Sequence, residues 1–206
     1  GLMLPIPISG ILFLIQSGYP ADLVLRICVN SINDIQNSYG GEGRPQAGDP
    51  KFRELIMAIR ETQASGGMGM RTKTTKDKQA VVMFLRPLTD EAIDRPARRI
   101  RELLGLSETA REFNVVYGTY PEDNTEITIL SRSILQVLID LASYIDVPEV
   151  DLAEGSVYGF KRTPEQERMF PPLITVRTGP TAPLNTHVSV QYRSQWFWIE
   201  DRDRQS

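Results

Sequence analysis

Apolar side chains recur at helical spacing in several separated segments of the chain. Residues 8–17 read ISGILFLIQS, which predicts a short helix that is apolar almost all round. Gly18 ends this helix, and Pro20 opens a second helix that the pattern predicts over residues 20–37. Because the link between them is short, the two helices are expected to pack as a hairpin. Residues 1–65 are therefore predicted to be mostly helical.

Three further helices are expected. Asp49 and Pro50 mark the start of one, because Asp is a good N-cap and Pro fits the first turn. Another is predicted over residues 88–107, where Gly105 can end it. Residues 133–146, SILQVLIDLASYID, are apolar over a wide arc, which predicts a helix central to the core.

Other segments show the alternation that is typical of strands. They are residues 68–73, 78–86, 111–118, 125–130, 173–179, 187–193 and 196–201. The element order lacks regular β-α alternation, so we predict an α+β fold: a mainly antiparallel sheet backed by several α-helices, with the N-terminal helical hairpin. We expect one domain over residues 1–206, in which residues 66–206 mix sheet and helices.

Composition limits the classes of function. Hydrophobic residues make up 41% and charged residues 24% of the 206 residues, as in an ordinary folded protein. The net charge of −3 and a pI near 5.3 argue against a nucleic-acid binder. The single cysteine, Cys28, excludes an intrachain disulfide and is expected to be a small buried hydrophobe. The longest apolar stretch is too short for a transmembrane helix.

No motif for a nucleotide, a flavin or a catalytic metal is present. The glycine-rich GGMGM segment follows a helix and precedes a strand, whereas a phosphate-binding loop needs the opposite order. One histidine and one cysteine cannot build a zinc site by themselves. We therefore expect no cofactor and no metal.

A weak catalytic alternative involves the acidic C-terminal segment. Asp201 and Asp203 would share one side of a strand, where they could bind a divalent cation or act in acid-base chemistry with Glu200 or His187. This hydrolase hypothesis requires a pocket in which these groups meet Tyr117 or Tyr192. Because arginines alternate with the carboxylates, a solvated strand end with ion pairs is the preferred interpretation.

Basic residues gather at the predicted hairpin tip RTKTTKDK. Its cations could contact an acidic surface or anionic lipid headgroups: Arg71, Lys73, Lys76 and Lys78. No aromatic residue stands beside them to stack on bases, which argues against single-stranded nucleic acid. A second basic cluster, Arg95 to Arg101, alternates with acidic residues and indicates a charged outer helix face.

Three blocks carry a resemblance: LPIPISGILFLIQSGYPADLVLRICVNSIND, REFNVVYGTYPEDNTEITILSRSILQVLIDLASYIDVP and WFWIEDRDRQS. In this order they resemble a family of uncharacterised Gram-negative bacterial proteins that are often predicted to be secreted or lipoproteins. The resemblance implies an export signal and a further segment before the first block, and an aromatic, basic continuation after the last. It implies the periplasmic side of the cell envelope, with membrane contact only through a lipid anchor outside this chain. It supplies no catalytic residue.

The sequence thus predicts a non-enzymatic envelope module that binds a protein or a surface component. Trp196 and Trp198, in an apolar run at the C-terminal end, are its candidate binding residues, together with the basic hairpin. The ragged ends indicate an excised part of a longer polypeptide, and a homo-oligomer is compatible with this interpretation. The alternatives are the hydrolase and a small-molecule or lipid carrier in which the apolar N-terminal helix lines a groove.

Overall fold

The structure is a computed structural model that describes residues 1–40, 46–75, 78–86, 91–148, 151, 153 and 163–201. The chain forms two compact units. Unit 1 comprises Gly1–Ser38 and Ala47–Val137, and unit 2 comprises Tyr39–Gln46 and Leu138–Ser206. Whether the two units associate into the single domain expected over residues 1–206 stays a prediction. The fold class is α+β with a mainly antiparallel sheet, as predicted.

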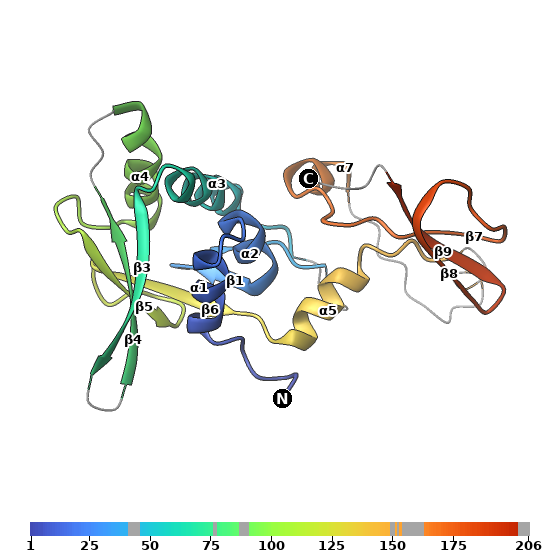
Figure 1. Ribbon diagram of the computed structural model, residues 1–206, viewed down its shortest axis with the longest axis horizontal. Coiled ribbons are helices and arrows are strands. Elements are labelled where there is room, and N and C mark those ends of the chain that lie inside the picture. The colour runs from blue at the N-terminus through green and yellow to red at the C-terminus, as the bar shows by residue number, and fades with distance from the viewer. Residues whose placement is uncertain are drawn as a thin grey trace. The chain divides into compact units, whose positions relative to one another are not determined.

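Unit 1 consists of helices and a six-stranded sheet (Figure 1). In chain order its elements are α1 (Ile8–Gln16), α2 (Ala21–Cys28), β1 (Val29–Ile32), β2 (Ile35–Gln36), α3 (Pro50–Ala64), β3 (Met68–Thr75), β4 (Lys78–Leu85), α4 (Glu91–Leu104), β5 (Glu112–Tyr117) and β6 (Glu126–Ser131). Helix α5 (Ile134–Ala142) crosses into unit 2, which holds α7 (Pro164–Met169), β7 (Arg177–Gly179), β8 (Thr186–Tyr192) and β9 (Gln195–Glu200).

The six strands follow the order β2-β1-β6-β5-β4-β3. Neighbours are antiparallel except for β5 and β6, which run parallel, with Val115 opposite Ile127. Residues 118–125 therefore return the chain to the end of the sheet at which β5 begins, so that β6 runs in the same direction as β5, and they do not form a hairpin turn. An Asx turn ends this connection, since the Asp123 carboxylate accepts from the Thr125 backbone N–H at 2.7 Å.

The prediction of a helix over residues 20–37 is wrong beyond Cys28. The chain leaves the helix there and forms the β1–β2 hairpin, whose turn residues Asn33 and Asp34 have φ angles of 44° and 64°. Asn and Asp tolerate this left-handed conformation better than most residues. Ile32 and Ile35, whose spacing would continue the apolar face of a helix, are buried as strand residues instead. The remaining predicted helical segments of residues 1–65 are confirmed, including the Asp49 cap on α3.

One face of the sheet forms the core of unit 1. Ladder pairs place large apolar side chains side by side on this face: Val81, Met83, Phe113, Val115, Ile127 and Ile129. Helix α1 contacts β3 and β5, α2 contacts β1, and α3 contacts β2 and β3. Burial of each such side chain contributes roughly 1.5–3 kcal/mol, so this layer of helices over the sheet holds the unit together.

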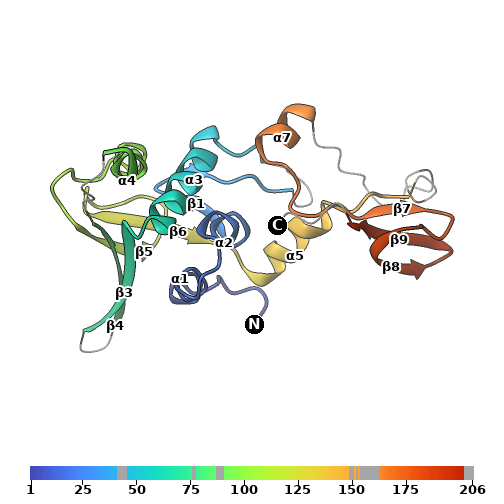
Figure 2. The ribbon, with the colours of Figure 1, turned by 45° about the horizontal axis from the view of Figure 1, so that its top comes forward.

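On the opposite face of β3 and β4, an aromatic ring packs over a glycine. The Phe84 ring lies across Gly69, where an added Cβ would meet the ring Cζ at 2.2 Å. Strands β3 and β4 form the predicted hairpin, which extends past the strands beside it (Figures 1 and 2). The described part of the chain contains no helix long and apolar enough to cross a membrane.

Helix α5 differs from its prediction as a central core helix. It ends at Ala142, and its apolar Ile134 and Leu138 are 48% and 52% exposed. The buried residue of the helix is Asp140, whose carboxylate accepts from the Gly40 N–H at 2.7 Å. This hydrogen bond turns a polar side chain inward, so the wide apolar arc is partly exposed to solvent.

Unit 2 contains a three-stranded antiparallel sheet in the order β7-β9-β8. The predicted hairpin of β8 and β9 is confirmed, with Arg193 and Ser194 as its left-handed turn residues at φ 46° and 64°. Strand β7 is shorter than predicted. Val176, just before it, forms a parallel bridge with Ile145 instead of pairing with β9.

Candidate functional site

The aromatic strand β9 is the central strand of the unit 2 sheet, and each of its residues is half-buried. Trp196 and Trp198 share one face of it because they are two residues apart. A Cβ on Gly179 of β7 would lie 3.2 Å from the Trp198 ring, so this ring packs closely over the glycine backbone. The structure thus brings the two predicted tryptophans together and gives Trp198 a packing role.

The other face of this sheet carries apolar side chains that are open to solvent. Val188, Val190 and Tyr192 of β8 are 50%, 60% and 60% exposed. They stand beside Phe197 and Ile199 of β9. Because β8 is at the margin of the sheet, one of its two edges pairs with no strand among the described residues. The strand reads THVSVQY and contains no Lys, Arg, Asp, Glu or Pro.

Of the catalytic candidates in the hydrolase hypothesis, Glu200, Asp201 and His187 lie at one end of the β8–β9 hairpin. Glu200 forms an ion pair with Arg177 at 2.8 Å, and His187 lies in the bulge of β8 near that end. Tyr192 is at the opposite end of β8, and Asp201 is exposed just after β9. Asp203 lies outside the described residues, and Tyr117 belongs to unit 1. No group of three metal-ligating side chains occurs within the described segments.

The predicted basic residues lie mainly on the sheet surface. Arg71 and Lys73 bind the two carboxylate oxygens of Glu112, with Lys73 Nζ at 2.8 Å. The hydrogen bond from Lys73, aided by the charge of Arg71, lowers the pKa of the Glu112 carboxyl. Lys76 lies outside the described residues, and the structure describes only the backbone of Lys78. Glu112 therefore offsets two of the four predicted cations.

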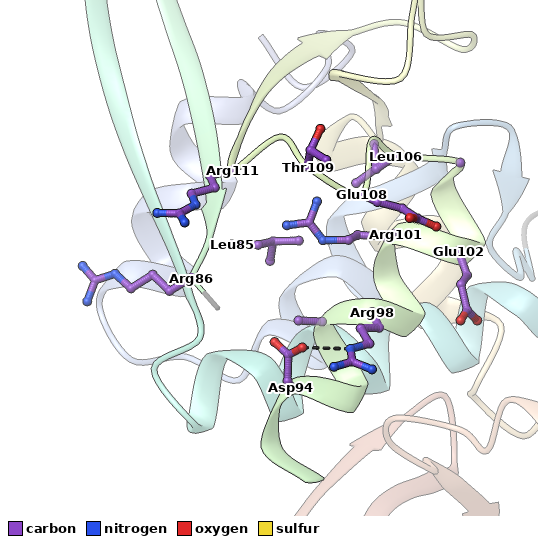
Figure 3. A pocket seen from close by; sticks show the side chains of 12 residues that line it. Leu85, Arg86, Asp94, Arg98, Arg101, Glu102, Leu106, Glu108, Thr109 and Arg111 are labelled. Atoms are coloured by element: carbon purple, nitrogen blue, oxygen red, sulfur yellow. Dashed lines mark hydrogen bonds and ion pairs between the residues drawn. The ribbon is translucent and has the colours of Figure 1, made fainter. Parts of the chain in front are cut away.

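Sequence reasoning missed a groove in unit 1 that arginines line. Arg86 follows β4, Arg111 precedes β5, and Arg101 lies in the last turn of α4 (Figure 3). The backbone N–H of Leu85 donates to the Arg111 carbonyl at 3.0 Å, which places the first two arginines on adjacent strand ends. In Figure 3 the Arg101 guanidinium points across the groove toward the strand side. We call this the arginine groove.

Arg101 is the most enclosed of these cations. Its Nη1 donates to the carbonyls of Ser107 and Ala110 at 2.5 and 2.8 Å, and its guanidinium lies 5.2 Å from the centroid of the Phe113 ring. Desolvation by burial lowers the pKa of Arg101, although an arginine remains charged in neutral solution. The signal in the sequence was weak, because Arg86 and Arg111 become neighbours only through strand pairing.

Cys28 is buried, as predicted. Burial raises the pKa of its thiol, and the nearby charge of Arg132 lowers it by a smaller amount. A thiol with a raised pKa is a poor nucleophile, so Cys28 fits the predicted role of a small hydrophobe.

No family model, curated protein or solved structure matches the chain. The chain's own side chains therefore carry the argument for function.

Proposed function

We propose that the chain is a non-enzymatic binding module that takes up an extended segment of a protein partner along strand β8. The observation that carries this proposal is the exposed, uncharged margin of the unit 2 sheet. Natural sheet edges are commonly protected by lysine, proline or a covering element. Strand β8 has neither residue type, and its side chains from His187 to Tyr192 are exposed.

The register of the hairpin indicates which groups would bind the partner. In a hairpin with a two-residue turn, Tyr192 and Gln195 form a hydrogen-bonded pair, as does Val190 with Phe197. The intervening residues Ser189 and Gln191 then direct their N–H and C=O groups away from β9. A partner strand added here would gain main-chain hydrogen bonds. Its apolar side chains would extend the face of Val188 and Val190, so we expect an extended, apolar segment.

The resemblance supports a place for this module on the periplasmic side of the cell envelope. Membrane association would then come from a lipid anchor outside this chain. Fractionation of cells that carry the full-length protein tests this, because an anchored form would sediment with membranes and be released by detergent. Recovery in the cytoplasmic fraction would contradict the proposed location.

The strand-addition proposal is tested at Ser189. A photo-crosslinker at Gln191 identifies the partner segment, and a synthetic peptide of that segment is then titrated into the purified chain. Ser189→Pro removes an outward N–H while it leaves the pairs between β8 and β9 in place. We expect this change to weaken peptide binding at least 10-fold, whereas the turn variant Ser194→Gly binds as the wild type does.

Two results would contradict strand addition: unchanged binding by Ser189→Pro, or crosslinks to a segment that binds elsewhere on the chain. Crosslinks from Gln191 to a second copy of β8 would replace the protein partner by self-association. Light scattering of the purified chain distinguishes that case from a heterologous partner.

An open apolar groove favours the carrier as a second candidate. It lies between Pro5–Ser9, at the start of α1, and residues of β4 to β6 that include Val81 and Tyr117. The carrier hypothesis expects the apolar N-terminal helix to line a groove, and in this groove the helix contributes Ile8 and Ser9. Saturable binding of a fluorescent fatty acid that is lost in Tyr117→Lys, at an exposed groove position, while folding is retained, would support a carrier. Absence of saturable binding would remove it.

A further inference from the structure

We infer that the arginine groove of unit 1 is a binding site for an oxyanion, either a phosphoryl or a carboxylate group. This site is separate from the β8 surface, since the groove belongs to unit 1 and β8 to unit 2. The two proposals therefore succeed or fail independently.

The first argument is convergence from distant parts of the sequence. Arg86, Arg101 and Arg111 come from the end of β4, the end of α4 and the start of β5, yet all three line one groove (Figure 3). Figure 3 shows Arg86 and Arg111 extending to the same side from the two adjacent strand ends, where a bound anion would offset their like charges. Guanidinium groups also match the geometry of carboxylates and phosphates.

The second argument is the charge balance of the described lining. Asp94 accepts from Arg98 at 2.9 Å, so these two residues offset each other. Glu102 binds Arg99, which lies outside the groove, at 2.7 Å. Because Arg99 also binds Glu54, it does not fully offset Glu102, and the described lining sets Arg86, Arg98, Arg101 and Arg111 against Asp94, Glu102 and Glu108. The groove therefore favours an anionic ligand.

The third argument is preorganisation of the donors. Aromatic rings support two of the guanidinium groups: Arg86 lies 5.4 Å from the Phe84 ring centroid, and Arg101 lies 5.2 Å from that of Phe113. The Ser107 and Ala110 carbonyls hold one nitrogen of Arg101, Nη1. Donors that are already fixed lose little conformational freedom when a ligand binds.

Calorimetric titration of the purified chain with inorganic pyrophosphate and, separately, with citrate tests the inference. We expect saturable binding of at least one probe, and binding should weaken as salt is added because the contacts are ionic. A preference for pyrophosphate would indicate a phosphoryl ligand, and a preference for citrate would indicate a carboxylate.

The groove variant is Arg86→Gln/Arg111→Gln. Both side chains are exposed, so the variant should fold, and circular dichroism checks this. The matched control is Arg53→Gln/Arg60→Gln, which removes the same charge from exposed positions on α3. We expect at least a 10-fold loss of affinity in the groove variant and little change in the control. Absence of binding to the wild type, or an equal loss in both variants, would overturn the inference.

Discussion

Asn33 and Thr128 are joined by hydrogen bonds in both directions. The Asn33 side-chain oxygen accepts from the Thr128 N–H at 2.7 Å, and the Asn33 N–H donates to the Thr128 carbonyl at 3.0 Å. The Asn33 side-chain nitrogen also donates to the carbonyl of Leu104, at the end of α4, at 3.0 Å. One turn residue therefore connects the β1–β2 hairpin, the middle of β6 and a helix terminus.

We expect Asn33→Gly to lower the free energy of unfolding by about 2 kcal/mol, because the Thr128 N–H loses a part-buried acceptor. Asn33→Ala should cost about 1 kcal/mol more, since alanine is strained at a φ of 44°. Urea denaturation followed by circular dichroism measures both values. Equal stability of the two variants would contradict the strain argument, and wild-type stability of Asn33→Gly would contradict the hydrogen-bond argument.

Arg132 is predicted to be the most sensitive polar residue of unit 1. Its side chain is 1% exposed and donates to Asn30, to the Arg26 and Ile27 carbonyls at the end of α2, and to the Ser38 carbonyl. We expect Arg132→Met to cost about 3 kcal/mol or more, because these acceptors lose a buried donor. Arg132→Lys should be nearly as damaging, because one ammonium cannot reach such widely spread acceptors. Wild-type stability of Arg132→Lys would refute this.

Gly69 and Phe84 provide a test by double substitution. An alanine Cβ at position 69 would lie 2.2 Å from the Phe84 ring Cζ, so the ring must move. We expect Gly69→Ala to cost about 2 kcal/mol of unfolding free energy. The same change in a Phe84→Leu background should cost much less, because the shorter side chain leaves room. A double-mutant cycle without coupling would show that the ring does not limit position 69.

The Glu112 ion pairs predict a dependence of stability on pH. The pKa of Glu112 lies below its ordinary value of 4.5, so its contribution is fully present above that value and is lost as the pH falls through the folded-state pKa. The free energy of unfolding, measured from neutral to acidic pH, should fall less in Glu112→Gln than in the wild type. Glu122→Gln, at an exposed carboxylate, is the control. Identical acid profiles for Glu112→Gln and wild type would contradict the assignment.

Local signals in the sequence were enough to predict most elements correctly. The Asp49-Pro50 pair marked the start of α3, and strict alternation identified β8 and its hairpin with β9. The β1–β2 hairpin was not predicted, because its apolar residues are also compatible with helical spacing. Asn33 and Asp34, which form the turn of this hairpin, stand between Ile32 and Ile35 in the sequence.

Properties that depend on strand pairing could not be read from the sequence. Nothing local indicates that β5 and β6 are parallel, because the pairing depends on the path of residues 118–125. The same limit applies to the arginine groove, where Leu85 must pair with Arg111 before Arg86 has its cationic neighbour. Trp196 and Trp198 were found as a pair because they stand two positions apart on one strand, with Phe197 between them.

The pairing of β1 with β6 has a consequence for biosynthesis. β1 ends at Ile32, whereas its neighbour β6 begins only at Glu126, so a ribosome must add the whole intervening stretch before the two can meet. Until then β1 has only the short β2 beside it, while the β3–β4 hairpin can close as soon as it emerges. Distant contacts of this kind slow folding. The nascent chain should therefore reach its protease-resistant form late, after β6 has left the exit tunnel.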